Sequence, residues 1–307
     1  MPRTRKTDQD PTLSQAATRR RRSPASILWT VVALAACTTP PLPSITPEPT
    51  NERHIGQFVW RDLLTTDLAA AQAFYGGLFG WTFSPTGDSK YVLASLHGRP
   101  MAGMADVSGE ADVNSSQWVS WISVSDVDEA TATTVSAGGS VIRGPKDRPN
   151  RGRFAVVAGP TGALVVLVVP QGGDPINREA EVGDWLWQEL WTDDTETALS
   201  YYGQLAGYTQ EQADGGIEQD YFVLETEGEP RAGVTMIPWD WVSPNWLPYI
   251  RVDDAQAYAQ RAEPLGGRVL FAPRSDVRQG TTAIIVDPTG AGFALQQWPV
   301  PERGRNR

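Results

Sequence analysis

Cysteine and histidine are almost absent from this chain: Cys37 is its single thiol, and His54 and His97 are its only imidazoles. One cysteine excludes an intramolecular disulfide framework and a cluster of thiolate metal ligands. A nucleophilic triad is excluded as well, because there is no Gly-x-Ser-x-Gly motif and neither histidine falls on a predicted core strand. Both histidines are expected at the surface.

Long apolar runs and positive charge are also scarce. The apolar run at residues 27–36 is shorter than the ~20 residues that a membrane-spanning helix requires. The 26 basic residues are outnumbered by 36 acidic ones, and seven of the basic residues lie in the first 36 positions. The rest of the chain is therefore strongly acidic, which excludes the basic surface of a nucleic-acid-binding protein and favours solubility.

The single cysteine follows a recognisable pattern. Arg19–Arg22 are followed by the apolar run and then by small residues that lead into Cys37. This order is typical of an export signal, and Leu34-Ala-Ala-Cys37 resembles a bacterial lipobox, whose cysteine is lipidated. We expect a lipoprotein signal peptide at residues 1–36, a Pro-rich extended tether at 37–53, and membrane anchoring through Cys37 on the extracytoplasmic side. The alternative is an incidental cysteine in a disordered leader.

What the sequence has in abundance is internal repetition. Phe58–Asp67 returns as Trp185–Asp194, and Pro160–Ala163 returns as Pro288–Ala291, with an offset of 127 to 128 residues. Solenoid repeats are only roughly 20–50 residues long, so this period indicates a duplicated domain. We expect domain 1 at residues 54–172, a linker at 173–182, domain 2 at 183–299 and a tail at 300–307.

Each copy is itself predicted to consist of two similar halves. In the first half, alternation at residues 57–64 predicts a strand, Asp67 a helix N-cap and Gly80 the end of that helix. Three strands follow, and the same order of strand, helix and three strands restarts at Trp118. This order occurs four times in the chain, which predicts an α+β fold of four βαβββ modules.

The ordered motifs resemble a known superfamily. Thr65-Thr-Asp67, Phe74-Tyr-Gly-Gly-Leu-Phe-Gly-Trp81 and Gly159-Pro-Thr-Gly-Ala163 are together similar to the vicinal oxygen chelate superfamily of glyoxalase I, bleomycin-resistance proteins and extradiol dioxygenases. The resemblance covers nearly all of residues 54–299. It implies that the modules pair into two tandem glyoxalase-like domains, whose strands curve into open cups that bind a ligand.

The resemblance also implies where a metal would be held. Catalytic members chelate a divalent ion with His and Glu side chains that reach into the cup. The positions of this sequence that match those ligands are Trp60, Val119, Val166, Trp187, Leu247 and Ala294. None of these side chains can ligate a divalent ion, which needs imidazole, carboxylate or thiolate donors. We therefore expect no metal and no other cofactor.

Aromatic and acidic side chains replace the expected ligands. Alternate residues of a strand share a face, so Trp60 and Asp62 are expected to point into the first cup. The same alternation puts on one face of the second copy Trp185, Trp187, Glu189 and Trp191. A carboxylate between indoles could bind a cationic or hydroxyl-bearing small molecule. The predicted ligand-binding residues are Trp60, Asp62, Trp118, Trp121, Trp187, Glu189, Trp246 and Tyr249.

Simpler interpretations remain open for these residues. The indoles could fill the cups while the carboxylates pair with arginines such as Arg99 or Arg231. The basic loop Arg148–Arg153 could meet an anion, but a solvated loop is the simpler expectation.

The predicted function is thus a lipid-anchored protein that binds a small-molecule ligand without a metal. The alternative is an enzyme: a lyase or oxidoreductase with a metal at non-standard carboxylates, or an acid–base catalyst that uses Asp62 or Glu189. A third class is an interaction lipoprotein with vestigial cups. Acid–base catalysis usually needs matched partners, so one carboxylate per cup favours binding.

Overall fold

The computed structural model describes residues 42–110, 116–213 and 221–299. The expected signal peptide, Cys37 and the expected tail at 300–307 lie outside these ranges. No helix within the described ranges is long and apolar enough to cross a membrane.

Domain 1 forms one mixed eight-stranded sheet, with strand order β2-β3-β4-β1-β5-β8-β7-β6. Its elements are β1 (Phe58–Thr65), α1 (Leu68–Phe79), β2 (Thr82–Pro85), β3 (Tyr91–Leu96), β4 (Arg99–Asp106), β5 (Gln117–Ser123), α2 (Val127–Ser136), β6 (Ser140–Arg148), β7 (Gly152–Ala158) and β8 (Leu164–Pro170). The two modules join where β1 pairs antiparallel with β5. The opening strands of the modules therefore lie at the centre of the sheet.

Domain 2 repeats this topology in the order β10-β11-β12-β9-β13-β16-β15-β14. Its elements are β9 (Trp185–Thr192), α3 (Thr195–Ala206), β10 (Thr209–Ala213), β11 (Tyr221–Thr226), β12 (Glu229–Met236), β13 (Asn245–Val252), α4 (Ala255–Ala262), a 3-10 turn (Glu263–Leu265), β14 (Arg268–Phe271), a second 3-10 turn (Arg278–Gly280), β15 (Thr282–Val286) and β16 (Gly292–Gln297). The predicted α+β fold of four βαβββ modules in two tandem domains is confirmed.

The helices begin where the sequence predicts. Each of the four α-helices in the described residues has an aspartate N-cap, whose carboxylate accepts a backbone N–H of the first turn: Asp67, Asp126, Asp194 and Asp254. This bond satisfies a donor that the helix itself leaves unpaired. α1 and α3 end at Gly80 and Gly207, both in the left-handed conformation that glycine adopts most readily.

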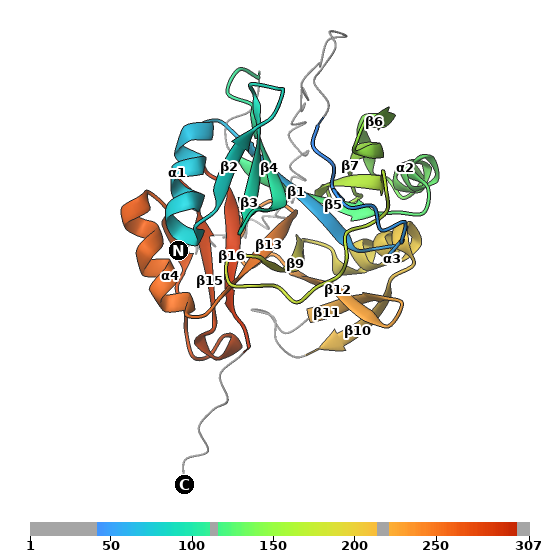
Figure 1. Cartoon of the computed structure of the whole chain (residues 1–307). Coiled ribbons are helices and arrows are strands. Elements are labelled where there is room, and N and C mark those ends of the chain that lie inside the picture. Colours follow the sequence, from blue (N-terminus) through green and yellow to red (C-terminus); the bar gives the residue numbers. More distant parts are fainter. Residues whose placement is uncertain (1–41, 111–115, 214–220, 300–307) are drawn as a thin grey trace, which may run out of the picture.

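The two domains share their hydrophobic cores. α1 packs beside α4, and α2 packs beside α3, so each contact joins helices of different domains (Figure 1). Phe293 of β16 lies against Phe74 and Tyr75 of α1, with ring centroids 6.1 and 5.6 Å apart. Because these rings are fully buried at the interface, neither domain buries its apolar surface alone.

The opposite faces of the two sheets carry separate clusters of buried residues. One cluster is built from domain 1 and includes Trp60 and Trp121. The other is built from domain 2 and includes Trp191 and Tyr249. Each cup is therefore formed by the sheet of a single copy. We call them cup 1 and cup 2.

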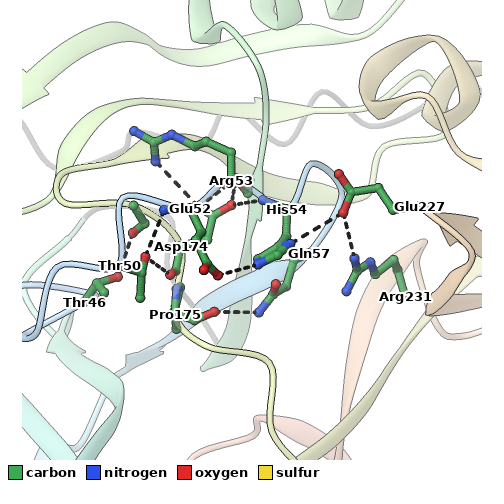
Figure 2. A network of polar contacts seen from close by, with 12 residues as sticks. Thr46, Thr50, Glu52, Arg53, His54, Gln57, Asp174, Pro175, Glu227 and Arg231 are labelled. Atoms are coloured by element: carbon green, nitrogen blue, oxygen red, sulfur yellow. Dashed lines mark hydrogen bonds and ion pairs between the residues drawn. The ribbon is translucent and has the colours of Figure 1, made fainter.

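The expected tether is packed where the structure describes it. Ile45 is 4% exposed and belongs to the cup 1 cluster. The Thr46 hydroxyl donates to the carbonyl of Gly173 at 2.8 Å, and Asn150 Nδ2 donates to the carbonyl of Leu42 at 3.3 Å. The expectation of a free, extended tether is wrong for residues 42–53, because their side chains find partners on domain 1 and the linker. Figure 2 shows how polar contacts continue from this segment to Asp174 and Glu227.

Candidate functional site in the cups

A buried ion pair lies at the floor of cup 2. Arg278 Nη2 is 2.6 Å from Glu189 Oε2, and the carboxylate is 1% exposed. Its other oxygen, Oε1, accepts hydrogen bonds from the Tyr249 hydroxyl and from Trp191 Nε1, both at 2.9 Å. Glu189 thus has a hydrogen-bond donor on each oxygen and a cation as partner.

Aromatic rings form the wall above this pair. Trp187 Nε1 donates to the Tyr221 hydroxyl at 2.9 Å. The Arg278 guanidinium lies 5.3 Å from the ring centres of both Tyr221 and Tyr249. Burial raises the pKa of Tyr221 and of Tyr249 well above the ordinary tyrosine value, so both hydroxyls stay neutral hydrogen-bonding groups.

Cup 2 contains a cavity of about 610 Å³. It is lined by Leu186, Trp187, Tyr221, Pro230, Tyr249, Arg278, Gln279, Thr281, Gln296 and Trp298. Within the part of the chain that the structure describes, the buried Oε1 of Gln296 has no hydrogen-bond partner. A buried acceptor left unpaired is unfavourable, so a ligand hydroxyl would be stabilised here.

Cup 1 holds the equivalent group in a different arrangement. Asp62 Oδ1 accepts the Tyr91 hydroxyl at 2.7 Å and Trp60 Nε1 at 2.9 Å, and Oδ2 accepts Trp121 Nε1 at 3.1 Å. Arg151 is completely buried, donates to the Tyr91 hydroxyl at 2.6 Å and lies 4.5 Å from the Trp60 ring. Aspartate is one methylene shorter than glutamate, and here a tyrosine hydroxyl stands between carboxylate and guanidinium.

Both cups depend on a glycine beneath the tyrosine. A Cβ at Gly103 would lie 1.7 Å from the Tyr91 hydroxyl, and one at Gly233 would lie 2.0 Å from the Tyr221 hydroxyl. Such distances are far inside van der Waals contact, so only glycine allows the tyrosine to reach the carboxylate at these positions. Gly103 pairs with Asp62 across β1 and β4, and Gly233 pairs with Glu189 across β9 and β12, so the two glycines are equivalent positions of the repeat.

The sequence named the wrong arginines as partners of the carboxylates. Arg99 pairs instead with Asp184, and Arg231 donates to Thr226. The arginines in the cups are Arg151 and Arg278, which lie in the segments after β6 and β14. Arg151 belongs to the basic loop that was expected to be solvated. The signal that could have found the pair is the repeat itself, because the two arginines stand at the same offset as Asp62 and Glu189.

Six of the eight predicted binding residues lie in the cups, and two do not. Trp118 donates to the Tyr75 hydroxyl and Trp246 to the Tyr202 hydroxyl, both at 2.8 Å, within the cores between the domains. Their prediction as cup residues is wrong. Trp118 is three residues from Trp121 on the same strand, and an odd spacing places the two side chains on opposite faces.

A β-bulge explains why the predicted orientation of Trp185 is wrong. Strict alternation predicts that Trp185 points into cup 2 with Trp187 and Glu189. The pairing of β9 with β13 shifts register between Tyr249 and Ile250, so Trp185 turns to the interdomain core and Leu186 lines the cup 2 cavity. One extra residue in a ladder moves the side chains beyond it to the other face.

The residues of the cups do not fit a divalent metal. The positions that match the ligands of catalytic relatives all face the cups, and they carry Trp60, Val119, Val166, Trp187, Leu247 and Ala294. The described residues contain no group of three or more His, Cys, Asp and Glu side chains that could hold an ion. His54 contacts Glu52 and Glu227, and His97 contacts Glu181, outside both cups.

Comparisons with known proteins agree with the fold. The family described as Glyoxalase/Bleomycin resistance protein/Dioxygenase superfamily matches residues 54–167. CFP32 of Mycobacterium tuberculosis, whose name provisionally places it among glyoxylases, is 33% identical over 249 residues, covering 80% of this chain and 95% of that protein. The anthracycline biosynthesis protein DnrV of Streptomyces peucetius is 32% identical over 268 residues, covering 78% of this chain and 92% of that protein.

Solved structures share the fold at lower identity. The Mn(II)-bound glyoxalase from Novosphingobium aromaticivorans has a TM-score of 0.56 at 17% identity, covering 79% of this chain and 82% of that chain. Homoprotocatechuate 2,3-dioxygenase from Arthrobacter globiformis has a TM-score of 0.56 at 13% identity, covering 86% and 85%. These structures show the fold alone. The family is shown by the two relatives, which are 33% and 32% identical to this chain along most of its length. The chain belongs to the glyoxalase/bleomycin resistance protein/dioxygenase superfamily.

Proposed function

We propose that this protein binds a flat aromatic small molecule bearing hydroxyl or carbonyl groups, and that cup 2 holds it without a metal. The single observation that carries the proposal is the cavity of about 610 Å³ with Trp187, Tyr221 and Tyr249 in its wall and the buried Oε1 of Gln296 unpaired among the described residues. Cavities of a few hundred Å³ with apolar walls and a few fixed polar groups suit ligands of this size.

The charges of cup 2 favour a neutral or oxygen-rich ligand over a cation. Arg278 neutralises Glu189, and the Tyr249 and Trp191 donors occupy its second oxygen. A cationic ligand would have to compete with a guanidinium that is already buried and paired, which is unfavourable. The expectation of a cationic ligand is therefore set aside, and a hydroxyl-bearing ligand is retained.

The relatives provide a chemical class that is compatible with this cavity. DnrV is named an anthracycline biosynthesis protein. Anthracyclines contain a planar ring system with hydroxyl and quinone oxygens, and flat rings of this kind stack on indole and phenol faces. We therefore choose a dihydroxyanthraquinone as the probe for cup 2.

Dihydroxyanthraquinone is expected to bind the wild-type protein and to quench tryptophan fluorescence in a saturable titration. Gly233→Ala should weaken binding at least about tenfold, because the new Cβ displaces the Tyr221 hydroxyl and with it the partner of Trp187. Gly109→Ala is the matched control, since a Cβ there meets nothing within 4 Å. Equal affinity in wild type and Gly233→Ala would contradict binding in cup 2.

The alternative of an acid–base or metal-assisted enzyme is tested on the same samples. Glu189 is poorly placed as a base, because both of its oxygens already accept hydrogen bonds and it is buried. Binding predicts that the probe is recovered with unchanged mass after long incubation. A new product that Glu189→Gln abolishes would favour the enzyme instead.

We also propose that Cys37 is lipidated and anchors the domains outside the cytoplasm. The positive, apolar and small-residue order that precedes Cys37 supports this proposal. Expressed in a bacterium, the wild-type protein should sediment with membranes, whereas Cys37→Ala should appear in the soluble fraction. An unchanged distribution, or a Cys37 thiol without lipid mass, would contradict the anchor.

A further inference from the structure

A second cavity system lies between the two domains. Part of its wall is shared with the cups, because Trp60 of cup 1 and Leu186, Trp187, Pro230 and Trp298 of cup 2 also line it. Two adjoining cavities of about 490 and 300 Å³ share Gln57, Phe58, Arg61, Asn177, Arg178 and Trp185. We call this the linker groove, because the linker residues Pro175–Ala180 form one side of it. Gln57 Nε2 holds that side in place by donating to the carbonyl of Pro175 at 3.2 Å (Figure 2).

Arg61 supplies a buried positive charge to this groove. It is 7% exposed and leaves β1 on the face opposite to Asp62. Its Nε donates to Gln188 Oε1 of domain 2 at 3.1 Å, and its guanidinium lies 4.9 Å from the Trp185 ring. Arg61 and Gln188 are equivalent positions of the repeat, so this contact lies where the opening strands of the two domains meet.

No carboxylate of the described residues forms an ion pair with Arg61. Asp184 raises its pKa from a distance, but Asp184 is itself bound to Arg99 and to the backbone N–H of Trp185. Burial outweighs this effect and lowers the pKa of Arg61 to about 10. Buried charges in proteins are normally paired, because an unpaired one is strongly unfavourable.

Two further polar atoms of the groove are unpaired within the described part of the chain. Gln188 Nε2 is a buried donor without an acceptor, and Gln57 Oε1 is a buried acceptor without a donor. Gln188 presents its free donor beside the guanidinium, because its Oε1 already accepts from Arg61. An acceptor that carries negative charge would satisfy both Arg61 and Gln188.

We propose that the linker groove binds a small carboxylate with a flat apolar body, with the carboxylate on Arg61 and Gln188. A guanidinium matches the planar geometry of a carboxylate and forms hydrogen bonds that are stronger than neutral ones. Phe58, Met101 and Trp185 line the same space and supply apolar contact for the rest of the molecule. Arg61 and Gln188 do not line the cup 2 cavity, so the proposed carboxylate site does not depend on the function proposed for that cup.

Benzoate is the probe, and benzamide is its neutral isostere. We expect calorimetric titration of the soluble fragment 38–307 to show saturable benzoate binding, and benzamide to bind at least about tenfold more weakly. Arg61→Met should weaken benzoate binding by a similar factor, while Arg61→Lys retains part of it. Arg178→Met is the matched control, because Arg178 is an exposed arginine at the rim of the same groove.

Competition separates this site from cup 2. Benzoate should keep most of its affinity for protein saturated with dihydroxyanthraquinone and for Gly233→Ala, because neither Arg61 nor Gln188 lines the cup 2 cavity. Three outcomes would overturn the proposal. They are displacement of benzoate by dihydroxyanthraquinone, equal affinity for benzoate and benzamide, and equal benzoate affinity of Arg61→Met and wild type. If Arg61→Met does not fold, the comparison of benzoate with benzamide on wild-type protein still decides between these outcomes. Failure of dihydroxyanthraquinone to bind would leave the benzoate result standing by itself.

Discussion

Glu189→Ala is expected to lower the free energy of unfolding by about 3–5 kcal/mol, because it leaves the Arg278 guanidinium buried without its carboxylate. The 2.6 Å ion pair is at the floor of cup 2, and Glu189 is 1% exposed. The same change removes the acceptor of the Tyr249 hydroxyl and of Trp191 Nε1. Urea unfolding followed by fluorescence and circular dichroism measures the loss.

Two variants test the cause of this loss. Glu227→Ala removes the carboxylate 3.6 Å from Arg231, but Glu227 is 55% exposed, so the expected change is within about 1 kcal/mol. Glu189→Ala combined with Arg278→Met removes both charges and should recover part of the stability, since a buried pair costs less to replace than to break. A double variant less stable than Glu189→Ala would contradict the unpaired charge as the main cause.

Phe293→Ala is expected to destabilise both domains together by about 3–5 kcal/mol. Phe293 belongs to domain 2, but it is fully buried against Phe74, Tyr75 and Phe79 of α1 in domain 1. Removing its ring leaves a cavity in the core that the two domains share. Calorimetry should show a single unfolding transition in wild type and variant, shifted to lower temperature in the variant.

The control for this prediction is Val135→Ala on α2. Val135 is 55% exposed, so its truncation should change stability by less than about 0.5 kcal/mol. Two separate transitions in the variant, with domain 1 unfolding at its wild-type temperature, would show that the interface does not couple the domains.

Much of the fold could be predicted from local sequence signals. The four capping aspartates and the glycines after α1 and α3 predict helix ends because they act on backbone groups only a few residues away. The alternation of β1 correctly placed Trp60 and Asp62 on one face. The repeat extended each of these assignments to the second copy.

The sites were harder to predict from the sequence, because they depend on contacts between distant residues. Arg151 and Arg278 come from loops, where no periodicity tells whether a side chain points to solvent or into a cup. The bulge in β9 reverses the face of Trp185, and the odd spacing of Trp118 and Trp121 places them on opposite faces of β5. The packing of Ile45 into the cup 1 cluster had no signal in a Pro-rich segment.

By itself, the sequence determined the duplication, the module order and the lack of metal donors at the matched positions, because these follow from residue identity and spacing along the chain. Only the tertiary structure decided that each carboxylate meets an arginine or a tyrosine, that the domains share their cores, and that Arg61 lies buried without a carboxylate partner among the described residues. These features depend on which side chains meet across the strands and domains, and that proximity arises only when the sheets have twisted, bulged and packed together.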